Sequence, residues 1–151
     1  MSNLKSTPKS LFYKLFKLGR IPKQVLPVLE SEGIELKDEG MSGRAVYRNV
    51  KGPHRRFIYK QEGTASCLVI TKKRIICYTF GKRQINIETT DPKRSEVKIS
   101  LKRENRLSIS FESSVFSDQW SGIIEFIFNT DMAPAFYNKL KELGMTEKEQ
   151  P

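Results

Sequence analysis

The side chains of this chain that could do chemistry are mostly basic. Six of them fall between residues 44 and 60 with no acid among them: Arg44, Arg48, Lys51, Arg55, Arg56 and Lys60. Arginine binds phosphate and carboxylate oxygens through paired hydrogen bonds, and lysine adds a point charge. At the centre of the stretch, Lys51-Gly52-Pro53-His54 is typical of a hairpin loop. The sequence therefore predicts an anion-binding surface around this loop.

The predicted anion site combines residues near this loop with two lysines of a later turn. Its members are Arg48, Lys51, Arg55, Arg56, Lys72 and Lys73. A run of cations is also typical of a solvated strand face that keeps a basic protein soluble, and lysines on edge strands prevent unwanted strand pairing. Both interpretations stay open at the level of sequence.

A second candidate surface lies in the first 29 residues, which carry six basic residues and no acid. Apolar residues recur there at helical spacing, which predicts a short amphipathic helix. Its candidate membrane contacts are Phe12, Lys14, Phe16 and Lys17. Each basic residue near an anionic membrane contributes about 1 kcal/mol to binding, and apolar side chains insert into the interface. The alternative is that the apolar face packs on the rest of the protein or on a second copy.

Residues that carry catalysis are scarce. The chain has one histidine, His54, in a turn crowded by cations, and two cysteines, Cys67 and Cys77. These are too few for a zinc site or a disulfide framework. The sequence also lacks a glycine-rich phosphate loop, a nucleotide-binding fingerprint and a paired-carboxylate motif. We therefore expect no enzyme activity, no cofactor and no metal.

The two cysteines are predicted to lie on neighbouring strands joined by a two-residue turn at Lys72 and Lys73. That turn length pairs Cys67 with Tyr78, one position away from Cys77. Because side chains alternate between the two faces of a sheet, the thiols should point to opposite faces. A disulfide or a shared metal is then not expected, although an odd-length turn would reverse this arrangement.

Composition limits the class of protein. The chain has 151 residues, 38% of them hydrophobic, and a formal net charge of +10 with a pI near 9.7. This size suits one globular domain, and no apolar run approaches the roughly 18 to 20 residues of a membrane-spanning helix. No signal-peptide pattern is present, so we expect a cytoplasmic protein, peripheral at the membrane if it binds one. The charge favours an anionic partner: a membrane lipid, an acidic protein surface or nucleic acid.

The hydrophobic periodicity changes from helical to alternating near Ile34. Before that residue, the pattern predicts a second helical piece that starts near Pro22 and stops at Gly33. A last helix is predicted over 131–143. Between the helices, β-branched and aromatic runs separated by turn residues predict strands at 43–50, 55–61, 65–71, 74–80, 84–90, 96–102, 106–113 and 121–129.

These elements predict a mainly β (α+β) fold. We expect a small curled antiparallel barrel of about seven strands, with the C-terminal helix covering apolar residues at one open end. A basic helical N-terminal extension is predicted over 1–33, the barrel with its helix over 34–144, and a polar tail over 145–151.

One hairpin resembles a known family. The segment Ser66–Ile75, which reads SCLVITKKRI, is similar to the G-x-L-x-(L/I)-T-x-x-R-(L/I) hairpin of bacterial pleckstrin-homology-like (PH-like) and GRAM-like domains. The closing strand and helix over 123–143 are similar too, so the resemblance covers 41–143. Ser66 departs from the pattern, which has glycine there. The resemblance implies a capped barrel that binds lipids, peptides or proteins in different members.

The resemblance also bears on the basic loop. In lipid-binding PH domains, basic residues around the first hairpin loop hold phosphoinositide phosphates, a pattern that Lys51, Arg55 and Arg56 match in part. We therefore expect a non-enzymatic binding or adaptor module that engages anionic groups on a membrane surface or a protein partner.

Two other function classes remain open. One is a nucleic-acid-binding protein that uses the same basic surface, with Phe57, Tyr59 and Tyr78 stacking on bases. The apolar strands around these aromatic residues favour a place in the core instead, and the chain shows no RNA-recognition, helix-turn-helix or zinc-finger signature. The other class is a protein-interaction or oligomerisation domain in which the charge serves solubility alone. The oligomeric state is left open.

Overall fold

The computed structural model describes residues 19–148. Its strands are β1 (Ile34–Lys51), β2 (Arg56–Thr71), β3 (Arg74–Thr79), β4 (Lys82–Glu88), β5 (Lys98–Arg103), β6 (Arg106–Glu112), β7 (Ser121–Asn129) and β8 (Thr146–Glu147). Its helices are α2 (Leu26–Glu32), α3 (Ala133–Glu142) and the short 3-10 turns η1 (Pro92–Glu96) and η2 (Ser113–Val115). The predicted helix that carries Phe12, Lys14, Phe16 and Lys17 lies outside the described residues.

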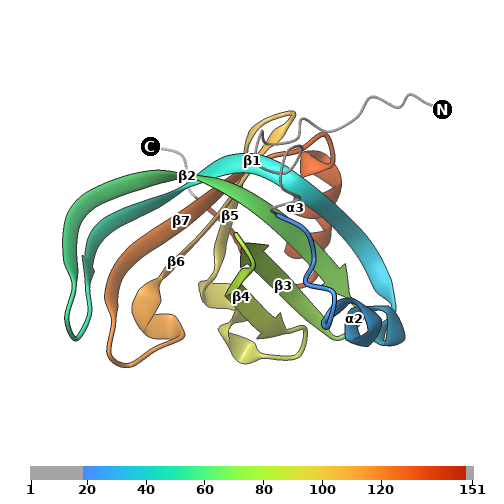
Figure 1. Cartoon of the computed structure of the whole chain (residues 1–151), viewed down its shortest axis with the longest axis horizontal. Coiled ribbons are helices and arrows are strands. Elements are labelled where there is room, and N and C mark those ends of the chain that lie inside the picture. The colour runs from blue at the N-terminus through green and yellow to red at the C-terminus, as the bar shows by residue number, and fades with distance from the viewer. Residues whose placement is uncertain (1–18, 149–151) are drawn as a thin grey trace.

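The eight strands form one sheet in the order β4-β3-β2-β1-β7-β6-β5-β8. The sheet curls into a half-barrel, and α3 covers one of its ends (Figure 1). The expected fold class, a curled and mainly antiparallel sheet with a C-terminal helix and a short helix before it, is confirmed. The sheet is not one continuous meander, however, because β1 pairs with β7 while the consecutive strands β4 and β5 are not neighbours. The half-barrel therefore stays open between its edge strands, β4 on one side and β8, which pairs with β5, on the other.

The first two strands are longer than the sequence predicts. The predicted strands at 55–61 and 65–71 form the single strand β2, because Gln61, Glu62 and Gly63 continue the ladder with β1. In sequence, the polar residues and glycine of this segment have the pattern of a turn. In the structure their side chains are exposed along the edge of a hairpin, and polar side chains are compatible with a strand there. Likewise β1 begins at Ile34, since Gly40, with φ of 69°, lies at a bulge between Asp38 and Met41 and does not end the strand.

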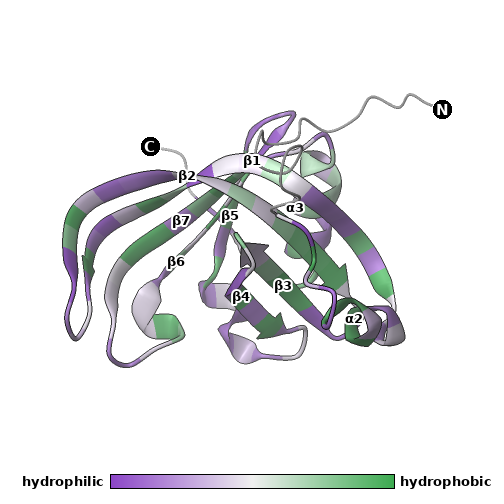
Figure 2. Cartoon of the chain, in the orientation of Figure 1, coloured by the Kyte–Doolittle hydropathy of each residue, from purple (hydrophilic) through white to green (hydrophobic). Residues whose placement is uncertain are grey.

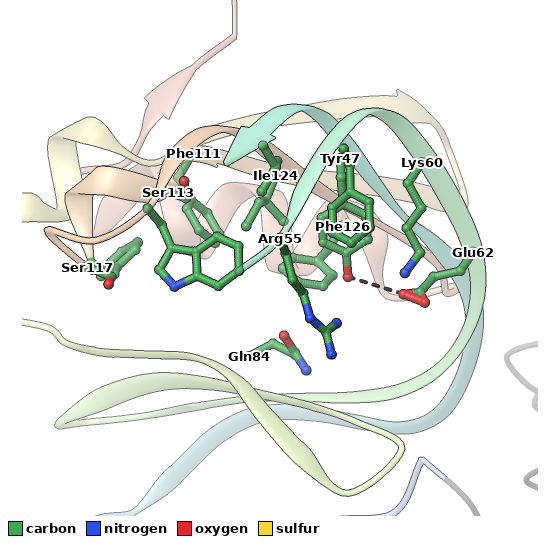
Figure 3. Close-up of a pocket in the computed structure, with 14 residues that line it drawn as sticks. Tyr47, Arg55, Lys60, Glu62, Gln84, Phe111, Ser113, Ser117, Ile124 and Phe126 are labelled. Carbon is green, nitrogen blue, oxygen red and sulfur yellow. Dashed lines mark hydrogen bonds between the residues drawn. The ribbon is translucent and has the colours of Figure 1, made fainter. Parts of the chain in front are cut away.

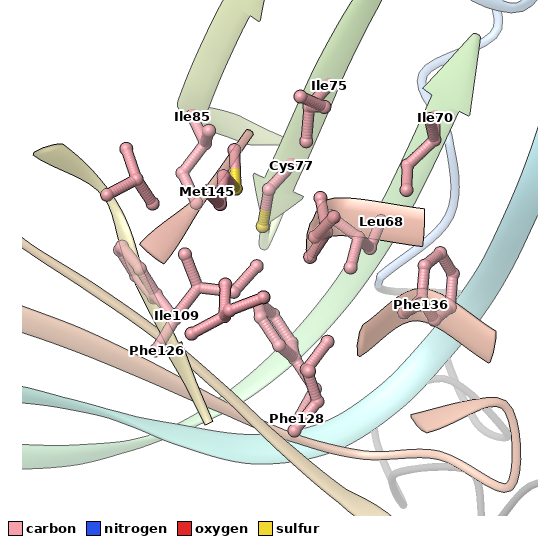
Figure 4. Close-up of a cluster of buried hydrophobic side chains, with 14 of the residues drawn as sticks. Leu68, Ile70, Ile75, Cys77, Ile85, Ile109, Phe126, Phe128, Phe136 and Met145 are labelled. Atoms are coloured by element: carbon pink, nitrogen blue, oxygen red, sulfur yellow. The ribbon is translucent and has the colours of Figure 1, made fainter. Parts of the chain in front are cut away.

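The main core lies on the concave face of the sheet. Leu68, Ile70, Ile75, Cys77 and Ile109 meet there with Phe126 and Phe128, and Phe136 of α3 packs on the same cluster (Figure 4). The helix packs on the sheet through its apolar side, which carries its buried residues Ala133, Phe136 and Leu140. Colouring by hydropathy shows apolar residues along β3 and a mixture of polar and apolar residues along the β1–β2 hairpin (Figure 2). Residues 64–71 of β2 and 75–79 of β3 are buried throughout, so this part of the sheet is its most completely buried region.

A smaller core covers the convex face. There α2 packs through Leu29 on Cys67, Val69 and Tyr78. Gly33 ends the helix, as predicted, with φ of 85°. The register pairs Cys67 with Tyr78, which confirms that the two free thiols lie on opposite faces. Burial raises the pKa of Cys67 to about 12 and raises that of Cys77 as well.

Candidate functional site

The β1–β2 loop and the β6–β7 connection reach the same end of the half-barrel (Figure 1). We call this the open end, in contrast to the end that α3 covers. The loop is closed by a hydrogen bond from the Gly52 amide to the Arg55 carbonyl at 2.8 Å. Trp120 from the other connection packs directly on Gly52, where an added Cβ would lie 2.6 Å from carbons of the indole ring. The glycine therefore allows the two connections to touch.

Behind this contact lies a cavity of about 340 Å³. Its walls are mostly apolar and come from β1, β2, β4, β6 and β7, the β1–β2 loop and the connection that carries η2 (Figure 3). The apolar lining residues are Tyr47, Val50, Phe57, Phe111, Phe116, Trp120, Ile124 and Phe126. Phe126 also belongs to the main core, so the base of this cavity lies directly against that core.

Polar side chains gather at the other side of the cavity. Arg55 extends toward Gln84 of β4 (Figure 3). The hydroxyl of Tyr47 donates a hydrogen bond to Glu62 at 3.3 Å, and the ammonium of Lys60 lies 4.6 Å from the centre of the Phe57 ring. Burial, together with the charge of Glu62, raises the pKa of Tyr47 to about 12, so this phenol remains a proton donor at neutral pH. The arrangement offers donors and positive charge beside an apolar space.

A second cavity of about 400 Å³ continues from the first. The two share Tyr47, Arg55, Lys60, Glu62, Gln84 and Phe126 as lining residues. The continuation adds the polar residues Thr64, Thr79 and Lys82 together with Ala45 and Phe80, and it lacks most of the aromatic wall of the first part, so it is the more polar of the two. Across both parts, the lining residues include three cations, Arg55, Lys60 and Lys82, and one carboxylate, Glu62. The combined space therefore runs from an aromatic region to a positively charged one.

One hydroxyl in the aromatic part lacks a partner. Ser113 is 5% exposed and lines the cavity, and its Oγ makes no hydrogen bond within residues 19–148. An unsatisfied buried hydroxyl costs about 1–3 kcal/mol, so such groups usually have a protein, water or ligand partner.

The structure brings part of the predicted anion site together. Arg55 lines the cavity, and Lys51 and Arg56 form the last register pair of the β1–β2 ladder, both exposed. Arg48 points elsewhere: its guanidinium donates to Glu125 at 3.0 Å. Successive side chains along β7 point to opposite faces of the sheet. Because Phe126 lines the cavity on the concave face, its neighbour Glu125 lies on the convex face.

The two turn lysines lie far from the loop. Lys72 and Lys73 follow the C-terminal end of β2, whereas Arg55 precedes its N-terminal end. The strand has 16 residues, a path of roughly 50 Å at the usual rise of about 3.3 Å per residue. The structure therefore does not place these lysines at the open end.

Sequence reasoning missed the carboxylate that binds Arg48. Glu125 is 1% exposed, receives a hydrogen bond from Ser108, and lies 3.5 Å from the ammonium of Lys102. Burial alone would raise the pKa of this carboxyl, but the hydrogen bonds from Ser108 and Arg48 and the charge of Lys102 outweigh it, so the pKa lies below its usual value. A single acid within the apolar run 123–128 is the sequence signal for such a buried pair.

Within residues 19–148, no group of three His, Cys, Asp or Glu side chains is placed to hold a metal ion. In the same part of the chain, no helix has the length and apolar character needed to cross a membrane. No protein-family model and no curated protein matches this sequence.

Proposed function

We propose that this chain is a non-enzymatic binding module of the PH-like class that engages anionic groups at a membrane surface through its open end. The observation that carries the proposal is the combination of free cations and exposed apolar side chains on one hairpin. Lys51, Arg55 and Arg56 form no ion pair with any other residue of the described range.

Two apolar side chains of the same hairpin favour a membrane over an acidic protein or nucleic acid. Ile58 is 74% exposed and Tyr59 is 60% exposed, both on β2 a few residues beyond Arg56. Exposed apolar and tyrosine side chains beside cations suit a membrane interface, where the charges meet headgroups and the apolar groups enter the upper acyl region. Tyr59 was expected in the core, and its exposure corrects that prediction.

The fold supports the same proposal. The resemblance of Ser66–Ile75 to the PH-like hairpin implies a curled antiparallel sheet with a C-terminal helix, and the sheet order and the position of α3 agree with that implication. In that comparison, the β1–β2 loop of this chain corresponds to the loop that holds phosphates in lipid-binding members.

Co-sedimentation with vesicles tests the proposal on the full chain. Vesicles of phosphatidylcholine with phosphatidylserine should bind the protein, pure phosphatidylcholine should not, and salt should weaken binding. Replacing Lys51, Arg55 and Arg56 together by alanine should weaken it roughly 100-fold, from about 1 kcal/mol for each charge. The matched control removes the same charge elsewhere, through Lys72→Ala, Lys73→Ala and Lys93→Ala, and should bind almost as well as the unchanged protein.

Three outcomes would overturn the proposal. Equal losses in the two triple variants would show that net charge alone is responsible. Loss of binding in a Phe12→Ser, Phe16→Ser variant, with no loss in the hairpin variant, would assign the membrane contact to the N-terminal segment. Absence of vesicle binding, together with tight, salt-dependent binding of single-stranded DNA, would show that the partner is nucleic acid and not a membrane.

A further inference from the structure

We propose that the cavity at the open end is a binding site for a small amphipathic anion, a molecule with an apolar or aromatic body and one carboxylate, sulfonate or phosphate group. The apolar body would lie among Phe57, Phe111 and Trp120, and the anionic group would bind Arg55. This site goes beyond the proposed membrane contact, with which it shares only Arg55.

The first argument is the presence of the cavity itself. Protein interiors are close-packed, with few voids larger than a water molecule. At the end that α3 covers, the concave face follows this rule, since Phe136 and Leu140 fill the space above the sheet. At the open end the same face instead leaves a pocket of about 340 Å³ that is open to solvent and has mainly apolar walls, a volume within the range of ligand sites. A ligand with an apolar body would complete the packing there.

The second argument is the charge around the cavity. The lining cations Arg55, Lys60 and Lys82 outnumber the single carboxylate, Glu62, and that carboxylate already accepts a hydrogen bond from Tyr47. An anion near Arg55 therefore gains a charge-assisted hydrogen bond, whereas a cation would be repelled. The apolar part and the charged part adjoin each other, so one molecule of amphipathic chemistry matches both.

The third argument is the unsatisfied hydroxyl of Ser113 in the aromatic part. A purely apolar void would not need a hydrogen-bonding group in its wall, whereas ligand sites combine apolar walls with a few polar groups. This hydroxyl favours a ligand that carries a polar atom on its body, such as an amine, an ether or a ring nitrogen, over a plain hydrocarbon chain.

The chain provides its own reporter for this site, because its one tryptophan, Trp120, lines the cavity. The probe is 1-anilinonaphthalene-8-sulfonate, which has an aromatic body, an amine and a sulfonate. In the absence of vesicles, the unchanged full chain should bind it saturably at one equivalent, with energy transfer from Trp120. Decanoate should displace it, and decanol, with the same chain length and no charge, should do so much less effectively.

Two neighbouring arginines give a matched pair of variants. Arg55→Gln should weaken probe binding about tenfold, since it removes a hydrogen bond to a charged group. Arg56→Gln, which removes the same charge one residue away from the cavity, should leave probe binding unchanged. Both residues are exposed, so neither variant should affect folding. A variant that loses vesicle binding and keeps probe binding separates the two sites.

The inference would be overturned by any of three results. These are the absence of saturable probe binding, equal displacement by decanoate and decanol, and equal affinities of the two arginine variants. Failure of vesicle binding alone would contradict the proposed function and leave the cavity site intact.

Discussion

The two ends of the half-barrel use the same concave sheet face in different ways. At one end α3 covers the face, and its buried side chains Phe136 and Leu140 join the main core. At the other end no α-helix of residues 19–148 covers the face, and two connections meet through Gly52 and Trp120 above a cavity. The sheet is continuous between the two ends, so the difference arises from the elements and side chains that pack on it at each end.

The comparison indicates that one end of the molecule contributes mainly to stability and the other mainly to binding. Burial of large apolar side chains supplies most of the favourable free energy of folding, and Phe136 and Leu140 of α3 are fully buried parts of the main core. The open end is made of turns that carry cations and half-exposed aromatic residues, which contribute less to stability and are free to contact a ligand. We therefore expect substitutions at the two ends to have separable effects.

The largest expected effect is on stability at the end that α3 covers. Phe136→Ala should lower the free energy of unfolding by about 3–5 kcal/mol, because it leaves a cavity in a fully buried site. Phe116→Ala at the open end should cost about 1 kcal/mol or less, because Phe116 is 39% exposed and contacts Phe111 edge-to-face. Denaturant unfolding followed by circular dichroism measures both, and equal losses would contradict the comparison.

A smaller effect is expected on the convex face. Glu125→Gln should destabilise the protein by about 1–3 kcal/mol at neutral pH, because the charged hydrogen bonds with Arg48 and Ser108 are lost. The control is Glu62→Gln, which changes an exposed carboxylate and should alter stability by less than about 0.5 kcal/mol.

The same carboxylate gives a pH dependence with a defined sign. The folded pKa of Glu125 lies below the ordinary value of 4.5, so its contribution to stability is fully present above pH 4.5 and is lost as pH falls through the folded pKa. Unfolding measured between neutral and acid pH should therefore show a steeper loss of stability in the unchanged protein than in Glu125→Gln. Parallel curves would contradict the assignment.

The smallest effect is expected at the contact between the two connections. In Gly52→Ala the added methyl group must displace Trp120, which should shift the tryptophan emission to longer wavelength and cost about 1 kcal/mol of stability. Gly63 lies further along β2, where no atom lies within 4 Å of the added Cβ. Gly63→Ala should therefore leave the emission unchanged, and a similar shift in both variants would show that Trp120 does not depend on this contact.

Regular hydrophobic patterns made most of the fold predictable from the sequence. The run at 121–129 coincides with β7, and the helix predicted over 131–143 contains α3. The alternation around Cys67 and Cys77 gave the correct register, because a two-residue turn determines it. The errors fall where glycine and polar residues lie inside strands, as at Gly40 and Gly63, because the sequence alone does not distinguish a bulge or an exposed strand from a turn.

The site was less predictable. Arg55 was correctly singled out as a cation of the first loop, and the structure places it at the cavity. Its neighbour Arg48 belongs to the same run but is bound by Glu125, a carboxylate 77 positions away in sequence. The cavity itself leaves no local signal, since Phe57 and Phe111 have the pattern of core residues. Only the fold shows that, in the described part of the chain, no α-helix packs over them.

The most direct test of the difference between the two ends is an amide chemical-shift map of the full chain, recorded with increasing 1-anilinonaphthalene-8-sulfonate. We expect the shifts to cluster at the open end, at Arg55, Gln84, Ser113 and Trp120. The amides of α3 and of the turn at Lys72 and Lys73 should remain unchanged. Shifts that centre on α3 or on that turn, or that spread evenly over the basic surface, would contradict the assignment of ligand binding to the open end.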